Sequence, residues 1–188
     1  MLFRSVGAEL LRKDGRTGIN HLSGVLGGEG IQVGRVSGSF PDLSNWRSGS
    51  LAVDLELDHL GRLGESLGIF PDSKVPARLS LSLVGAKDVN DPFFVSIEGQ
   101  TEFLEMSVTG KLKSLDASSD FNLTSRISTQ DVSKLSQLIQ TDIPITGPVW
   151  IEVALSRDPS IEKGFLNGTV KVKAEQIIGE GKIGRAHV

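Results

Sequence analysis

Apolar and polar residues alternate with a period of two along most of this chain, and this alternation is the feature that most constrains its fold. It is clearest at residues 51–57, 79–83 and 149–155. Because successive side chains of a strand point to opposite faces of a sheet, each segment is expected to be a strand with one apolar and one polar face. Clusters of Gly, Pro, Asn and Asp separate the segments. The chain is therefore expected to be mainly β.

Shorter stretches of the same alternation extend the strand prediction over much of the chain. They lie at residues 32–40, 93–97, 104–108, 121–127 and 166–172. At the head, residues 8–12 predict a strand and residues 13–16 a turn. Ile19, Leu22 and Leu26 follow the i, i+3, i+7 spacing of a helix and predict a helical stripe.

The same helical spacing indicates two further short amphipathic helices, at residues 59–68 and 130–140. Their apolar positions are Leu60, Leu63, Leu67, Val132, Leu135 and Ile139. Asp58 and Thr129 precede them as N-cap residues. Helices of two or three turns are too short to be stable alone, so both are expected to dock on the sheet.

The chain also repeats itself. Residues 51–83 match residues 123–155 at one constant offset and without a gap, through strand, helix, proline turn and next strand. Repeated units of this length, about 72 residues, bury their apolar faces against their neighbours, which favours an elongated, solenoid-like sheet. The expected organisation is a partial leading unit at residues 6–40 and two β-groove repeat units at residues 41–112 and 113–182.

The two ends of the chain are interpreted differently. Residues 1–5 and 183–188 resemble translations of the two strands of a short-read sequencing adapter, and such scars are expected to contribute little packing. On this interpretation, residues 6–182 are an internal slice of a longer reading frame.

Charge and composition argue against several classes of function. There are 20 Lys and Arg residues against 23 Asp and Glu residues, so the net charge is -3 and no nucleic acid partner is expected. The absence of Cys removes disulfides, thiolate nucleophiles and zinc–thiolate sites. No apolar run is long enough for a membrane-spanning helix.

Residues that could support catalysis or metal binding are few. His21 and His59 lie among polar neighbours in predicted helices, as solvated side chains do. Asp54 and Glu56 share the polar face of a strand, where carboxylates keep a sheet soluble. The loop at residues 88–91 lacks the spaced ligand set of a calcium site. We therefore expect no enzyme, no metal site and no cofactor.

The apolar positions of the strands form the candidate site. In an antiparallel sheet with matched register they fall on one face, which we expect to be one continuous concave surface that needs an acyl chain or a partner to cover it. The residues predicted to line it are Leu55, Leu57, Leu81, Leu83, Ile97, Met106, Val108, Ile127, Ile151, Val153, Val170 and Val172. The alternative is the closed core of a β-sandwich.

One segment carries a resemblance to a known family. Residues 123–155 run from a strand to the pattern x-D-V-x-x-L-x-x-L-I, then to I-P-I-T-G-P and a second strand. Residues 53–85 are similar, with Val75-Pro76 in place of the family's frequent Gly-Pro. Together with the glycine-flanked strand ends, this resembles the AsmA-like family of bacterial envelope proteins, which includes TamB and is related to bridge-like lipid-transfer proteins.

The resemblance implies a long, taco-like antiparallel sheet with an apolar concave side. It also implies a periplasmic protein, anchored to the inner membrane by an N-terminal helix outside this sequence, that conducts phospholipid toward the outer membrane or supports outer-membrane assembly. The partners implied are phospholipid acyl chains and the two membranes. The alternative function is a structural or interaction β-repeat scaffold, either a closed sandwich or a surface repeat protein, without lipid transport.

Overall fold

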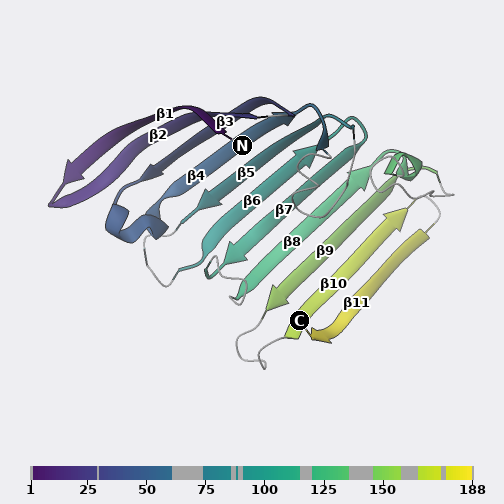
Figure 1. The fold of residues 1–188 in the computed structure, drawn as a ribbon. Coiled ribbons are helices and arrows are strands. Elements are labelled where there is room, and N and C mark those ends of the chain that lie inside the picture. Colours follow the sequence, from purple (N-terminus) through teal and green to yellow (C-terminus); the bar gives the residue numbers. More distant parts are fainter. Residues whose placement is uncertain are drawn as a thin grey trace.

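The computed structural model describes the chain except for residues 1, 29, 61–73, 86–87, 89–90, 115–119, 136–145, 158–164, 175–176 and 188. For residues 2–4, 46, 165–166 and 177–187 it describes the backbone alone. Eleven strands form one open antiparallel sheet in chain order (Figure 1), so the mainly β prediction is confirmed. The strands are β1 (Leu2–Lys13), β2 (Arg16–Gly28), β3 (Ile31–Phe40), β4 (Ser50–Leu57), β5 (Ala77–Val84), β6 (Phe93–Gln100), β7 (Leu104–Leu112), β8 (Phe121–Thr129), β9 (Val149–Arg157), β10 (Phe165–Ala174) and β11 (Ile177–His187).

The hairpin between β1 and β2 turns at Asp14 and Gly15, as predicted. Lys13 pairs with Arg16, so the loop has two residues, with φ values of 52° and 75°. Positive φ at both positions is the type I′ arrangement, whose twist matches that of the flanking strands. Asp-Gly is a favoured sequence for it because Gly adopts positive φ at no steric cost.

The helical stripe predicted at Ile19, Leu22 and Leu26 is wrong, because all three residues lie in strand β2. Glu9 pairs with His21 while Leu10 pairs with Ile19, so Asn20 is an extra residue, a β-bulge. The bulge puts Ile19 and Leu22 on the same face although they are three positions apart. A strand with a bulge can therefore imitate helical spacing.

The described residues contain little helix. They include two 3-10 helices, η1 (Leu43–Ser48) and η2 (Val132–Leu135). Of the two predicted helices, residues 61–68 and 136–140 lie outside the described residues. The strand–helix unit expected from the sequence is therefore not supported by the described part of the chain.

The residue that caps η2 is Asp131, not Thr129. The Asp131 carboxylate accepts hydrogen bonds from the Ser133 amide (3.1 Å) and the Ser133 hydroxyl (2.8 Å). Hydrogen bonding to Ser133 lowers the pKa of Asp131. Thr129 is buried, and its hydroxyl donates to the carbonyl oxygen of Phe103 (2.7 Å).

The strand positions recur with the period found in the sequence. The ends of β2, β3 and β4 lie one period before the ends of β6, β7 and β8, respectively. The starts of β5 and β6 lie one period before the starts of β9 and β10, respectively. One period therefore spans four strands. β5 therefore has the position in its repeat unit that β9 has in the next repeat unit.

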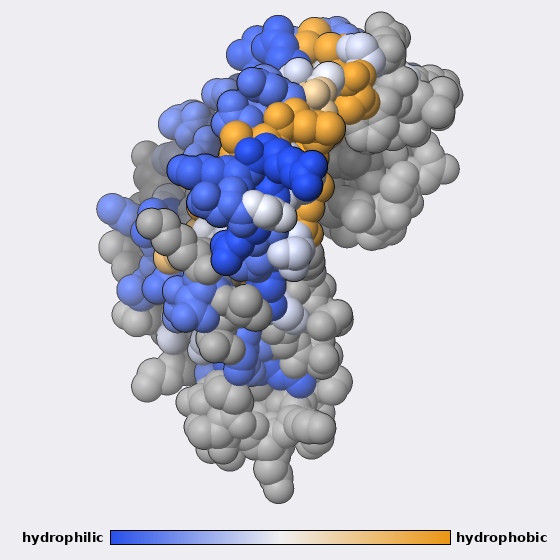
Figure 2. All heavy atoms as spheres, turned by 90° about the vertical axis from the view of Figure 1, so that its left-hand side faces the viewer, coloured by the Kyte–Doolittle hydropathy of each residue, from blue (hydrophilic) through white to orange (hydrophobic). Residues whose placement is uncertain are grey.

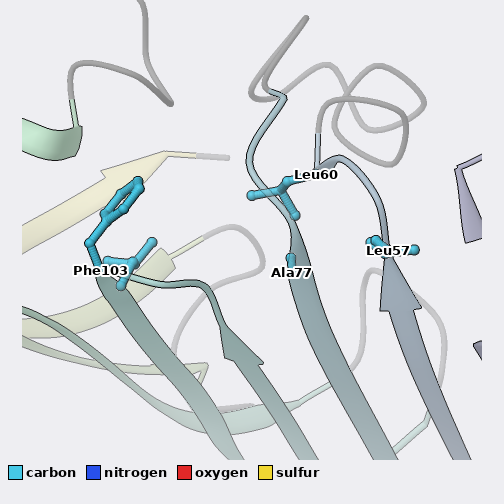
Figure 3. Close-up of a cluster of buried hydrophobic side chains, with 5 residues drawn as sticks. Leu57, Leu60, Ala77 and Phe103 are labelled. Carbon is cyan, nitrogen blue, oxygen red and sulfur yellow. The ribbon is translucent and has the colours of Figure 1, made fainter. Parts of the chain in front are cut away.

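Five buried apolar residues form a cluster at one end of the sheet, where β4 leads to β5 and β6 turns into β7 (Figure 3). We call them the base cluster: Leu57, Leu60, Ala77, Phe103 and Leu104. Each is exposed by 9% or less. Leu135 of η2 also packs against this cluster, so connecting segments as well as strands form the base.

Candidate functional site

The pairing register places the apolar positions of β4 to β10 on one side of the sheet, the apolar face. Directly paired residues share a face, so each register row crosses the strands from one end of the sheet to the other. The row nearest the base cluster contains Leu55, Leu79, Gly99, Met106, Ile127, Ile151 and Val172. The next contains Val53, Leu81, Ile97, Val108, Ser125, Val153 and Val170. Ser125 is thus the polar member of an otherwise aliphatic row.

All twelve residues predicted from the sequence lie on the apolar face. Ten belong to the two rows above, and Leu83 lies in the following row, opposite Leu51 and Val95. Leu57 differs from the others because it is only 5% exposed and belongs to the base cluster. Whether these residues line a lipid groove stays a prediction.

The middle of the apolar face is only partly shielded by the residues that the structure describes. Leu81 is 37% exposed, and most other members of its row are half-buried. The described residues form one sheet, and among them no second sheet covers it. Figure 2 shows hydrophilic residues gathered on one side of the molecule and hydrophobic residues in a band beside them.

Neighbouring side chains close over Gly99, the glycine in the row nearest the base cluster. A Cβ at Gly99 would lie 2.7 Å from Cγ of Met106 and 3.1 Å from a methyl carbon of Leu79. Met106 and Leu79 are the residues paired with Gly99 on either side. The side chains of Met106 and Leu79 therefore fill the space above Gly99 from either side and keep the row apolar.

The end of the sheet opposite the base cluster is held by Arg47 of η1. The Arg47 guanidinium lies 4.7 Å from the centre of the Phe93 ring, a cation–π contact, and donates to the carbonyl oxygen of Lys113. The ring belongs to a residue that is 3% exposed. The carbonyl oxygen of Arg47 overlaps the place that a Cβ of Gly85 would take, so only glycine fits there.

The opposite side of the sheet is the polar face, and several of its charges are paired across strands. Arg126 Nε lies 2.9 Å from Glu152 Oε2, and Arg78 Nε lies 3.7 Å from Glu56 Oε1. Ser80 donates a 2.7 Å hydrogen bond to Asp54. These carboxylates therefore have structural partners on neighbouring strands.

The other candidates for chemistry are isolated from one another. His21 is exposed on β2, opposite Glu9 and not in a helix, and His59 is exposed in the segment after β4. No group of three or more His, Cys, Asp or Glu residues within the described ranges is placed to hold a metal ion. No helix in the described part of the chain is long and apolar enough to cross a membrane.

Sequence reasoning missed three hollows, each lined at least in part by residues of the polar face. Their volumes are about 350, 500 and 310 Å³. The largest runs from Arg78 on β5 to Trp150 on β9, and Trp150 also borders the smallest. The available signal was Trp150 itself, an aromatic residue at a polar position of its strand.

Comparison of the chain with protein-family models, with curated proteins and with solved structures found no match.

Proposed function

We propose that this chain is a segment of a periplasmic, AsmA-like lipid conduit, in which the apolar face shields phospholipid acyl chains on their way toward the outer membrane. The observation that carries the proposal is the aliphatic face itself, which crosses seven strands from β4 to β10 and stays partly open to solvent at Leu81. Exposed apolar area of this kind normally has a ligand or a partner.

The mechanism is passive partitioning. Each methylene moved from water to an apolar surface contributes about 0.8 kcal/mol, so a lining of Leu, Ile, Val and Met holds acyl chains without hydrogen bonds. The two central rows contain one polar side chain, Ser125. A lining without fixed polar contacts lets the chains slide along the face while their headgroups stay in water.

The second candidate function is a scaffold that binds other chains through its sheet edges. The observation that favours it is β1, an edge strand in the sheet order, with exposed Val6 (57%) and Leu10 (72%). An edge strand presents unpaired backbone groups to which another strand can add.

Photolabelling with a phosphatidylethanolamine that carries a diazirine on its acyl chain tests the lipid proposal. We expect cross-links at residues of the apolar face and lipid that co-purifies with the chain in native mass spectrometry. Leu81→Asp should reduce both, because a charge among acyl chains costs several kcal/mol. Ser82→Asp is the matched control, since Ser82 is the next residue of the same strand and faces the other side.

Two results distinguish the alternatives. Equal labelling of both faces, or no change with Leu81→Asp in a chain that still folds by circular dichroism, would contradict the lipid proposal. The scaffold would be favoured if Val6→Lys and Leu10→Lys abolished binding to a partner chain while lipid labelling was at background level both in the parent chain and in the variants.

A further inference from the structure

The largest of the three hollows, which is lined mainly by residues of the polar face, has the composition of a ligand site. It holds about 500 Å³ and its walls include Arg78, Glu98, Gln100, Glu105, Arg126 and Trp150. Pockets that bind small molecules combine an aromatic or apolar surface with a few polar groups that fix orientation. This hollow lies on the opposite side of the sheet from the apolar face. A ligand site in the hollow therefore does not depend on the proposal that the apolar face shields lipid.

The register makes the hollow a trough that runs across the strands. Arg78 pairs with Gln100, Gln100 with Glu105, Glu105 with Ser128, and Ser128 with Trp150. With a strand spacing of about 4.8 Å, Arg78 and Trp150 stand about 19 Å apart at its two ends. Each is the second residue of its strand, β5 or β9, so the trough spans one four-strand period. Its shape suits an extended ligand.

The charges of the trough disfavour an anionic ligand. Two cationic and two anionic side chains line it, so its formal charge is balanced. The cations are already engaged, since Arg78 pairs with Glu56 (3.7 Å) and Arg126 with Glu152 (2.9 Å), both outside the trough. A phosphate or sulfate would have to compete with Glu56 and Glu152 for the two arginines, and it would also meet the negative charges of Glu98 and Glu105.

Trp150 supplies the aromatic surface. It is half-buried on the polar face and borders two hollows, so part of the indole is accessible from the trough. An indole ring stacks on the C–H face of a pyranose, while carboxylates and amides such as Glu105 and Gln100 bond to the hydroxyl rim. We infer that the trough binds a neutral oligosaccharide, stacked on Trp150 and hydrogen-bonded to Glu105 and Gln100.

The test uses ¹⁹F NMR on the full chain labelled with 5-fluorotryptophan. The sequence has two Trp residues, so two resonances are expected, and Trp150→Phe assigns them. Chitohexaose, cellohexaose and maltohexaose are the probes. At least one should shift the Trp150 resonance saturably, with a Kd of about 1 mM or tighter. The Trp46 resonance is the internal control.

Variants locate the site. Glu105→Gln should weaken binding of that probe about tenfold, whereas Thr109→Ala, on the same strand and face but outside the trough, should not. Three results would overturn the inference: no saturable shift with any probe, equal shifts of both resonances, or equal loss of binding in the two variants. Tighter binding of a heparin hexasaccharide than of every neutral probe would also overturn it.

Discussion

The backbone N–H of Val132 donates a hydrogen bond to the carbonyl oxygen of Gly147 (2.9 Å), and one period earlier Leu60 makes the same bond to Val75 (2.8 Å). Both donors are buried apolar residues, exposed by 7% and 9%. In each case the bond closes a long connection at the base of the sheet. The connections after β4 and β8 are thus fixed at equivalent points.

The first prediction concerns this closure. Leu60→Ala should lower the free energy of unfolding by about 2–4 kcal/mol, because it leaves a cavity in the base cluster. Urea denaturation followed by circular dichroism measures the change. Leu43→Ala is the control, since Leu43 is 44% exposed and its truncation should cost less than about 0.5 kcal/mol. Equal effects would show that Leu60 does not belong to the core.

The second prediction concerns the close approach of η1 to β5. Gly85→Ala should destabilise the chain by about 2 kcal/mol or more, since the added methyl group overlaps the carbonyl oxygen of Arg47. Gly7→Ala should have little effect, because its nearest neighbour would be the Ser23 hydroxyl at 3.5 Å. The thermal midpoints of both variants check this. A stable Gly85→Ala chain would mean that η1 packs elsewhere.

The third prediction follows from the capping carboxylate of η2. Hydrogen bonds from Ser133 lower the pKa of Asp131 below 3.8. The Asp131 carboxylate therefore stabilises the fold at any pH above its unfolded-state pKa, and this stabilisation is lost as the pH falls through its folded-state pKa. Asp131→Ala should therefore be less stable than the parent at pH 7, and the difference should shrink below about pH 4. Thermal melts from pH 7 to pH 3 measure it. A difference that grows on acidification would contradict the assignment.

The fourth prediction tests whether the apolar face is open. The chain has no cysteine, so single thiols report on single positions. Leu81→Cys should react with Ellman's reagent in the folded state at least tenfold faster than Phe103→Cys, because Leu81 is 37% exposed and Phe103 is 8% exposed. Similar slow rates in both variants, with fast reaction after denaturation, would mean that the face is covered.

Most strands and the two faces of the sheet could be predicted from the alternation of apolar and polar residues. The same alternation indicates a strand and assigns each of its side chains to a face. Matched apolar parity then places Leu81 on the same face as Val53 and Ile97, although parity alone does not select which residues pair. The bulge at Asn20 could not be predicted, since nothing in Ile19 and Leu22 separates a bulged strand from a helix. Nor could the polar-face trough, because it joins residues from five strands that are far apart in the sequence.

The order of the sheet also bears on how such a chain evolves and folds. Each described strand pairs only with the strands next to it in the chain. If the gene segment that encodes one four-strand unit is copied or removed, the strands that become neighbours pair as β4 pairs with β5 or as β8 pairs with β9. Sheet length becomes a trait that tandem duplication adjusts in steps of four strands. Since every described pairing is between strands that are neighbours in the sequence, folding can begin at any hairpin and extend to the strands on either side. The folding rate therefore need not fall as the sheet becomes longer.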